Sequence, residues 1–175
     1  MINDILDLAH LESGKITLDR QAGDINKIIR SVVEAQESVA RDKGLYLKAS
    51  LDPSIPVLVF DQDKVIQVLN NLINNALKFT DAGGITVTSQ ADEGNHQVEV
   101  CIQDTGCGIK EEDLTKLFEK FQQLGEAHQR QAGTGLGLAI CKEIIRQHGG
   151  KVGVRSKMGQ GSCFYFILPA EPRKG

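Results

Sequence analysis

"DKVIQVLNNLINNALKFT", residues 63–80, carries the pattern that decides the fold class. Its apolar residues recur at i, i+3, i+4 and i+7, which is the spacing of an amphipathic helix. Asp61 lies just before the run and can cap the helix N-terminus. We therefore predict a helix that begins after Asp61, ends near Lys78 and buries Val65, Val68, Leu69, Leu72, Ile73 and Ala76.

The same helix carries a second, polar line formed by Asn71, Asn75 and Lys78. Asparagine is a poor residue inside a helix because its side chain competes for backbone hydrogen bonds, so two in register need an explanation. An amide oxygen is a suitable ligand for Mg²⁺, and a lysine ammonium suits a phosphate. The alternative interpretation is a solvated polar face without a ligand.

The flanking sequence alternates between helices and strands. Asp24 can cap a helix that Gly44 closes, a short helix is expected near Glu111 to Phe118, and another within residues 134–150. Strands are predicted at residues 15–20, 45–51, 57–60, 85–90, 97–104, 151–156 and 162–169, with hairpin turns at 91–95 and 157–161. This mixture predicts an α+β fold, a two-layer α/β sandwich in which a mixed, mostly antiparallel sheet packs on helices.

Length and charge narrow the function classes. At 175 residues the chain can form one domain with a full core, and its net charge of −3 argues against binding nucleic acid or an anionic membrane. No apolar run approaches the roughly 18 residues of a membrane span and no signal-peptide pattern opens the chain, so we expect a cytoplasmic location without direct membrane contact. The four cysteines form neither a C-x-x-C pair nor a zinc spacing, and we expect reduced, structural thiols.

A second candidate site is "DTGCGI", residues 104–109, at the end of a predicted strand. Gly106 and Gly108 allow positive φ angles and a close approach of the backbone to a ligand. A carboxylate repels phosphate but can accept a hydrogen bond from an exocyclic amine such as that of adenine. Asp104 therefore favours a purine base as the ligand, and the alternative is an ordinary Asp-Gly turn, because short glycine motifs are weakly specific.

A third candidate is "GTGLGLAI", residues 133–140, where three glycines lead into a helix. Backbone N–H groups at a helix N-terminus bind anions, so an oligophosphate is the best candidate ligand. The spacing is neither the G-x-G-x-x-G of a dinucleotide site nor that of a P-loop. The alternative is a hinge with close helix packing.

These stretches occur in one chain, and together they are far more specific than any one alone. "NNLINNALKFT" (70–80), "DTGCG" (104–108), "FEKF" (118–121) and "GTGLGL" (133–138) resemble the N, G1, F and G2 boxes of sensor histidine kinases. Residues 1–14 resemble the end of the second dimerisation helix of these kinases, and residues 15–175 resemble their catalytic ATP-binding domain. The resemblance implies the Bergerat fold of the GHKL superfamily.

The resemblance also implies ATP and Mg²⁺ as ligands and assigns roles to residues. Asp104 would receive the adenine amine, Asn75 would coordinate Mg²⁺, and Asn71 and Lys78 would help to hold the metal or the phosphates. A lid over about residues 122–132 would be anchored by Phe118 and Phe121 and would bring Arg130 to the γ-phosphate. The implied nucleotide-binding set is Asn71, Asn75, Lys78, Asp104, Gly106, Gly108, Ile109, Phe118, Phe121, Arg130, Gly133, Thr134, Gly135, Leu136, Gly137 and Leu138.

The phosphoacceptor of the family has no match in this chain. An acidic residue follows the acceptor histidine in the family, and it follows none of His10, His96, His128 and His148. The acceptor and the general base are therefore expected upstream of Met1. The expected partners are ATP or ADP, the dimerisation and phosphotransfer helices of the parent kinase, and the receiver domain of a response regulator, whose aspartate takes the phosphoryl group from the histidine.

Two other functions stay open at this point. ATPases of the same fold, such as Hsp90, MutL and type II topoisomerases, place a catalytic glutamate one turn before the metal asparagine, where this chain has Asn71. A non-catalytic nucleotide-binding or partner-docking module is the other alternative. Ala132-Gly133 also replaces the Gly-Gly that many histidine kinases have before the last box, which predicts a less flexible lid.

Overall fold

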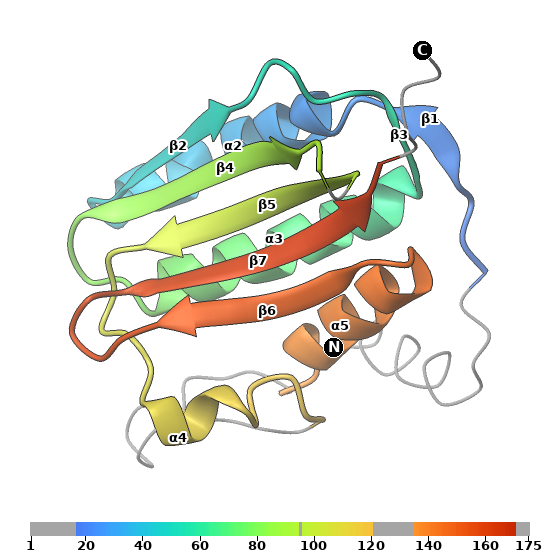
Figure 1. Cartoon of the computed structure of the whole chain (residues 1–175). Helices are drawn as coiled ribbons and strands as arrows, with labels where there is room; N and C mark the ends of the chain where they lie inside the picture. The colour runs from blue at the N-terminus through green and yellow to red at the C-terminus, as the bar shows by residue number, and fades with distance from the viewer. Residues whose placement is uncertain (1–16, 95, 121–134, 171–175) are drawn as a thin grey trace.

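The computed structural model describes residues 17–94, 96–120 and 135–170, which form two layers (Figure 1). One layer is a five-stranded sheet of β2 (Tyr46–Leu51), β4 (Gly84–Asp92), β5 (Gln97–Asp104), β7 (Ser162–Pro169) and β6 (Lys151–Ser156), in that spatial order. The other layer contains α2 (Ile25–Asp42), α3 (Gln62–Lys78) and α5 (Gly137–Gln147), which contact β2, β5 and β6 respectively. The predicted α/β sandwich is confirmed.

The sheet is mixed and mostly antiparallel, as predicted. β2 pairs with β4 in parallel, and the β4–β5, β5–β7 and β6–β7 pairs are antiparallel. β4 with β5 and β6 with β7 form the two predicted hairpins, and β5 lies at the centre of the sheet between β4 and β7. A separate two-stranded ribbon pairs β1 (Gln21–Gly23) with β3 (Leu58–Phe60).

Local sequence signals explain where the long helices begin and end. The Asp24 carboxylate accepts the N–H of Asn26 at 2.9 Å, and α2 is followed by Gly44 at φ 71°. The Asp61 carboxylate accepts the N–H of Lys64 at 3.0 Å and so caps α3. All six apolar residues predicted for the buried face of α3 are buried.

His148 joins the end of α5 to the start of α3. Its Nε2 accepts the backbone N–H of Asp61 at 3.0 Å, and its Nδ1 lies 2.7 Å from the carbonyl oxygen of Ile144. The ring is therefore neutral, with Nδ1–H as the donor. Burial lowers the pKa of His148, and the nearby Arg20 acts in the same direction, whereas the Ile144 and Asp61 contacts oppose them.

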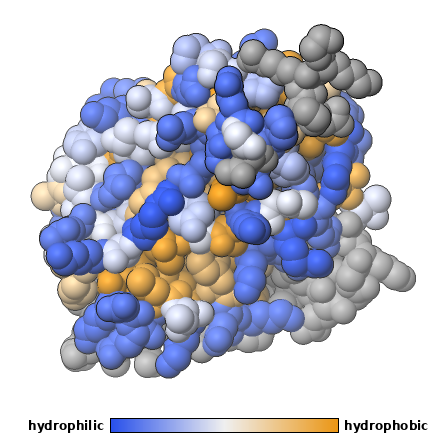
Figure 2. All heavy atoms as spheres, viewed as in Figure 1, coloured by the Kyte–Doolittle hydropathy of each residue, from blue (hydrophilic) through white to orange (hydrophobic). Residues whose placement is uncertain are grey.

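Side chains of the sheet alternate between a buried and an open face. In β5, Val98, Val100 and Ile102 are buried against the helices, whereas Glu99, Cys101 and Gln103 point the other way. Figure 2 views the molecule from this open side, where hydrophobic residues gather between hydrophilic ones. No helix among the described residues combines the length and apolar character needed to cross a bilayer.

Two secondary-structure predictions need correction. No strand forms at residues 17–20 of the predicted strand 15–20, and β1 begins at Gln21 instead. The N–H of Asp19 donates to the Asp61 carboxylate at 2.9 Å, so it serves that side chain rather than a strand ladder. The short helix α4 covers only Glu111–Leu114. Residues 1–14, predicted as the end of a dimerisation helix, lie outside the described residues.

The expectation of reduced thiols is wrong for two of the four cysteines. Cys101 and Cys163 form a disulfide, with Cα atoms 6.1 Å apart. They are 62 positions apart in the sequence, but both lie on the open face of neighbouring strands, within the Cα separation that a disulfide needs. Cys107 is a free exposed thiol and Cys141 is free and buried.

Candidate functional site

Asp104 is the last residue of β5 and is 4% exposed. One carboxylate oxygen, Oδ1, accepts the backbone N–H of Gly106 at 2.8 Å and that of Ser162 at 3.1 Å. Among the described residues, no hydrogen bond uses the other oxygen. Burial raises the pKa of this carboxyl, and the two N–H donors oppose the rise. The arrangement fixes the side chain and leaves one oxygen as an acceptor.

The turn after Asp104 leaves no room for side chains at its two glycines. A Cβ at Gly106 would lie 2.3 Å from the carbonyl oxygen of Phe79, at the end of α3. Gly108 has φ +72°, and a Cβ there would lie 2.1 Å from the carbonyl oxygen of Lys157. The predicted need for glycine at both positions therefore has a steric cause.

The β6–β7 hairpin supports this turn from the other side. The Gly159 N–H donates to the carbonyl oxygen of Cys107 at 2.7 Å, and the Ile109 N–H donates to Ser156 Oγ at 2.9 Å. Gly161 has φ +82°, and a Cβ there would lie 2.1 Å from the carbonyl oxygen of Asp104. The β6–β7 hairpin and the turn after β5 thus jointly fix the position of Asp104.

The predicted polar line on α3 begins with Asn71, which lies against α5. Burial raises the pKa of the neighbouring Cys141 thiol to about 12, and Asn71 opposes that rise. The Cys141 thiol donates to the carbonyl oxygen of Val68 on α3 at 3.9 Å. A Cβ at Gly137 would lie 3.4 Å from Asn71 Oδ1, which is an ordinary van der Waals distance, so the start of α5 lies directly beside Asn71. Asn75 is half-buried, and the ammonium of Lys78, one turn further on, lies 5.2 Å from the ring centroid of Phe79.

The start of α5 is the third part of the site. Gly135 has φ 68°, Leu136 is buried and Leu138 is half-buried. Gly137 is the first residue of α5, and its N-cap residue, Leu136, makes no side-chain cap hydrogen bond. N–H groups at a helix N-terminus attract an anion, and here they begin beside Asn71 of α3.

Phe118 packs against the core, and its predicted role as an anchor of the lid stays a prediction. Its ring meets Phe164 edge to face, with centroids 6.5 Å apart. Ile109 also packs against the core. Phe121, Arg130, Gly133, Thr134 and the predicted lid lie outside the described residues.

Sequence reasoning missed the residues that support Asp104 and the start of its turn. Ser162 and Gly161 come from a hairpin more than fifty positions away in the sequence. Thr105 Oγ1 donates to the carbonyl oxygen of Ala82 at 2.8 Å and accepts the Gly84 N–H at 3.0 Å. A Gly-Ser pair at the start of a predicted strand was the only local signal.

The described residues of the N, G1 and G2 boxes therefore all adjoin α3: the turn after β5 packs against Phe79 at its end, and the start of α5 lies beside Asn71. Residues 60–172 match the family model described as histidine kinase-, DNA gyrase B-, and HSP90-like ATPase. The chain belongs to this ATPase family.

Within this ATPase family, the similar proteins are histidine kinases. The chain is 40% identical over 174 residues to hybrid signal transduction histidine kinase L of Dictyostelium discoideum, covering 96% of this chain and 10% of that protein. Full-length ShkA, solved in complex with AMPPNP, superposes with a TM-score of 0.86 at 34% identity, covering 98% of this chain and 36% of ShkA. ThkA, solved in complex with the response regulator TrrA, gives a TM-score of 0.78 at 28% identity, covering 99% of this chain and 48% of that chain.

These similarities identify the chain as an ATP-binding catalytic domain of the histidine kinase type, with the GHKL fold. The chain spans only 9% to 28% of the length of the curated relatives it matches. The activity and partners of a whole kinase therefore go beyond what this chain shares with them.

Proposed function

We propose that the chain binds Mg-ATP and supplies the γ-phosphoryl group to a histidine on an acceptor helix, for relay to a response-regulator aspartate. The observation that carries the proposal is the Asp104 carboxylate, which is buried, fixed by two backbone N–H groups and left with one oxygen as an acceptor. The similarity to a kinase solved with AMPPNP supports nucleotide binding, and the similarity to a kinase solved with a response regulator supports the relay.

Asp104 would recognise the base rather than the phosphates. An ionised carboxylate only accepts hydrogen bonds, so its unused oxygen suits the exocyclic amine of adenine. Guanine presents a carbonyl oxygen at the corresponding ring position, and two acceptors facing one another repel. The site should therefore prefer adenine nucleotides over guanine nucleotides.

The phosphates would lie between α3 and the start of α5. The N–H groups at the α5 N-terminus suit phosphate oxygens, and Lys78 offers a positive charge at the end of α3. Gly135 and Gly137 would let the phosphates approach the backbone. Arg130, Gly133 and Thr134 are proposed to complete this side, with a lid over about residues 122–132.

The residues present fit Mg²⁺ as a metal held jointly by protein and phosphates. Among the described residues, no three His, Cys, Asp or Glu side chains gather to hold a metal ion. Asn75 is half-buried on the polar line of α3 and offers an amide oxygen, which is a hard ligand suited to Mg²⁺. Asn71 lies one turn before it on the same line. When bound, Mg²⁺ would supply positive charge to offset the charge on the phosphate oxygens.

The phosphoryl acceptor is proposed to lie on a separate helix. Of the two described histidines, His148 is buried with both ring nitrogens engaged, and His96 precedes β5 at the end opposite Asp104. A water-activating ATPase is disfavoured, because Asn71 stands where such enzymes have glutamate and an amide cannot act as a general base. Phosphoryl transfer depends mainly on positioning and charge stabilisation, which a nucleotide domain can supply.

Two experiments test this function. Asp104→Asn replaces an acceptor-only group by a mixed amide and should weaken ADP binding by about 1–3 kcal/mol. ADP and GDP are titrated into both proteins, and equal ADP affinity in the two would contradict the base assignment. In the second experiment, γ-labelled ATP is incubated with the chain alone and with an added protein that carries the acceptor helix. We expect acid-labile label on the added helix, and stoichiometric label on a histidine of this chain would contradict the proposal.

A further inference from the structure

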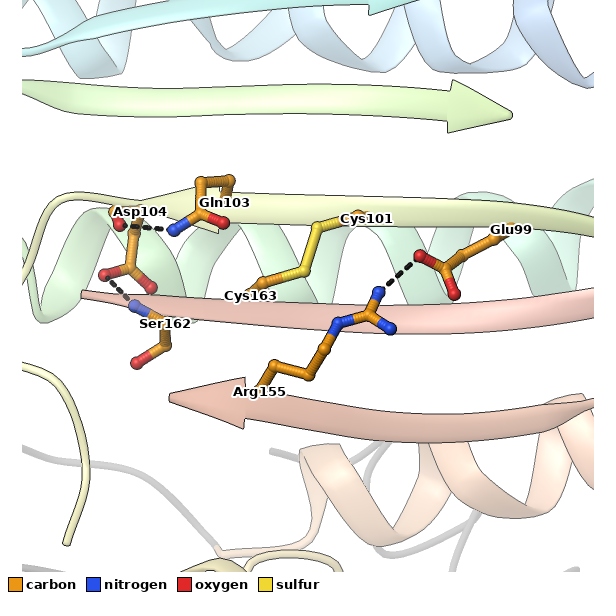
Figure 3. The surroundings of a disulfide bond; sticks show 7 residues. All are labelled: Glu99, Cys101, Gln103, Asp104, Arg155, Ser162 and Cys163. Carbon is orange, nitrogen blue, oxygen red and sulfur yellow. Dashed lines mark hydrogen bonds and ion pairs between the residues drawn. A yellow bond between two sulfur atoms is a disulfide. The ribbon is translucent and has the colours of Figure 1, made fainter. Parts of the chain in front are cut away.

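The Cys101–Cys163 disulfide crosslinks the two strands that hold Asp104 (Figure 3). In the antiparallel register of β5 and β7, Cys101 is opposite Tyr165 and Gln103 is opposite Cys163. The crosslink therefore runs diagonally over the open face of the sheet. Gln103–Cys163 is the last paired position at this end of the two strands, where pairing opens most easily.

The disulfide lies next in sequence to Ser162, a residue that supports the Asp104 carboxylate. Cys163 directly follows Ser162, whose N–H donates to Asp104 Oδ1 at 3.1 Å. Cys101 lies three positions before Asp104 on the partner strand. Opening of the strands at this end would separate Ser162 from Asp104, and a covalent bond between the strands opposes that opening.

Small molecules can reach the pair from the open side of the sheet. Both cysteines line a hollow of about 540 Å³, together with Arg155, Lys157 and Glu99. The Arg155 guanidinium pairs with Glu99 and lies 4.1 Å from the ring centroid of Tyr165. In the β6–β7 register Arg155 is opposite Cys163, and positive charge beside a thiol favours its thiolate form. The hollow gives a thiol reagent access to the pair.

We propose that Cys101 and Cys163 are a reversible thiol–disulfide site whose oxidised form holds Asp104 in its ligand-binding position. The oxidant is a low-molecular-weight disulfide, RSSR. One protein thiolate attacks it, a mixed disulfide forms and RS⁻ leaves. The second protein thiolate then displaces the other RS⁻, and the two leaving groups take up the two protons that the protein thiols lost. In sum, RSSR and two protein thiols give one protein disulfide and two RSH, and excess RSH reverses the reaction.

The exposure of the two residues sets the order of the steps. Cys101 is half-buried, whereas Cys163 is 8% exposed. Cys101 therefore takes the mixed disulfide from solution, and Cys163 resolves it. Replacing Cys163 by serine should trap the mixed disulfide on Cys101, and replacing Cys101 should prevent its formation.

The consequence for the nucleotide rests on the proposed function. If the oxidised form binds ADP more tightly by some factor, ADP must favour oxidation by the same factor, because binding equilibria are linked reciprocally. We expect a factor of about five, near the lower end of common coupling between sites. At a fixed concentration of reduced glutathione, the concentration of oxidised glutathione at half oxidation should then fall about fivefold when ADP saturates the protein.

The test uses the full chain with Cys107→Ser, so that the exposed third thiol does not react. It is equilibrated in glutathione buffers, and free thiols are counted by alkylation and mass measurement with and without ADP. Amide exchange at Ser162 and Gly106 is followed in the oxidised and reduced forms, since these N–H groups hold Asp104. Adding Cys101→Ser or Cys163→Ser to the same background gives matched controls that cannot form the crosslink.

We expect the parent to lose two thiols within one chain, and Ser162 to exchange more slowly in the oxidised form. The serine controls should show no such change, and Cys163→Ser should carry one glutathione on Cys101. Failure to form the crosslink, or equal Ser162 exchange in both forms, would overturn the inference. If Ser162 exchange responds but neither form binds ADP, the thiol–disulfide site stands and the proposed nucleotide function fails.

Discussion

Gly161→Ala is the most direct test of how the β6–β7 hairpin supports Asp104. Gly161 has φ +82°, and a Cβ there would lie 2.1 Å from the carbonyl oxygen of Asp104. Gly159, two positions earlier in the same turn, has φ +77° and no atom within 4 Å of an added Cβ. Alanine at either position meets the same backbone strain, but only alanine at 161 collides with Asp104.

The two substitutions should therefore differ in how much free energy they cost. An L-residue forced into the left-handed region costs about 1–2 kcal/mol, which applies to both variants. Relief of the 2.1 Å contact requires the hairpin and Asp104 to separate, and it breaks the Ser162 N–H bond to the carboxylate. A hydrogen bond to a charged group contributes about 1.5–3 kcal/mol, so Gly161→Ala should lose that amount in addition.

The assay is urea unfolding and ADP titration of the parent, Gly159→Ala and Gly161→Ala. We expect both variants to be less stable and only Gly161→Ala to lose ADP affinity, by about tenfold or more, because about 1.4 kcal/mol is a factor of ten. Equal ADP affinity in the two variants would refute the inference that the hairpin positions Asp104.

Two further predictions concern the metal and the pH dependence. Asn75→Ala should remove most of the Mg²⁺ enhancement of ATP binding without unfolding the chain, since Asn75 lies off the buried face of α3; undiminished enhancement would contradict Asn75 as a ligand. Burial holds the pKa of His148 below its ordinary value of 6.5, so the unfolded chain binds more protons than the folded chain as the pH falls. The contribution of neutral His148 to the free energy of unfolding is therefore complete above about pH 6.5 and is lost as the pH drops toward the folded pKa. Urea unfolding at about pH 7.5 and 5.5 should show a smaller loss for His148→Gln than for the parent, and equal losses would exclude His148 as the cause.

The long helices could be predicted because their signals are local. Asp61 stands immediately before α3, and the apolar period continues to Leu77. The glycines after Asp104 were also recognisable from the turn itself, although the atoms that require them, the carbonyl oxygens of Phe79 and Lys157, could not be named in advance.

Contacts between distant segments could not be predicted in the same way. Residues 15–20 alternate like a strand, but alternation does not reveal whether a partner strand is present, and the Asp19 N–H binds Asp61 instead. The Cys101–Cys163 pairing follows from the order β5-β7 in the sheet, which no spacing in the sequence encodes. The support of Asp104 by Ser162 depends on the same strand order.

The position of β7 between β5 and β6 also sets the order in which a nascent chain can complete its ligand site. Asp104 emerges from the ribosome well before Gly161 and Ser162, so during that interval its carboxylate lacks one of its two donors. Until β7 arrives, β5 has β4 on one side and an unpaired edge on the other. An unpaired edge can pair with another chain, so a product truncated before residue 161 should aggregate and should not acquire ligand affinity.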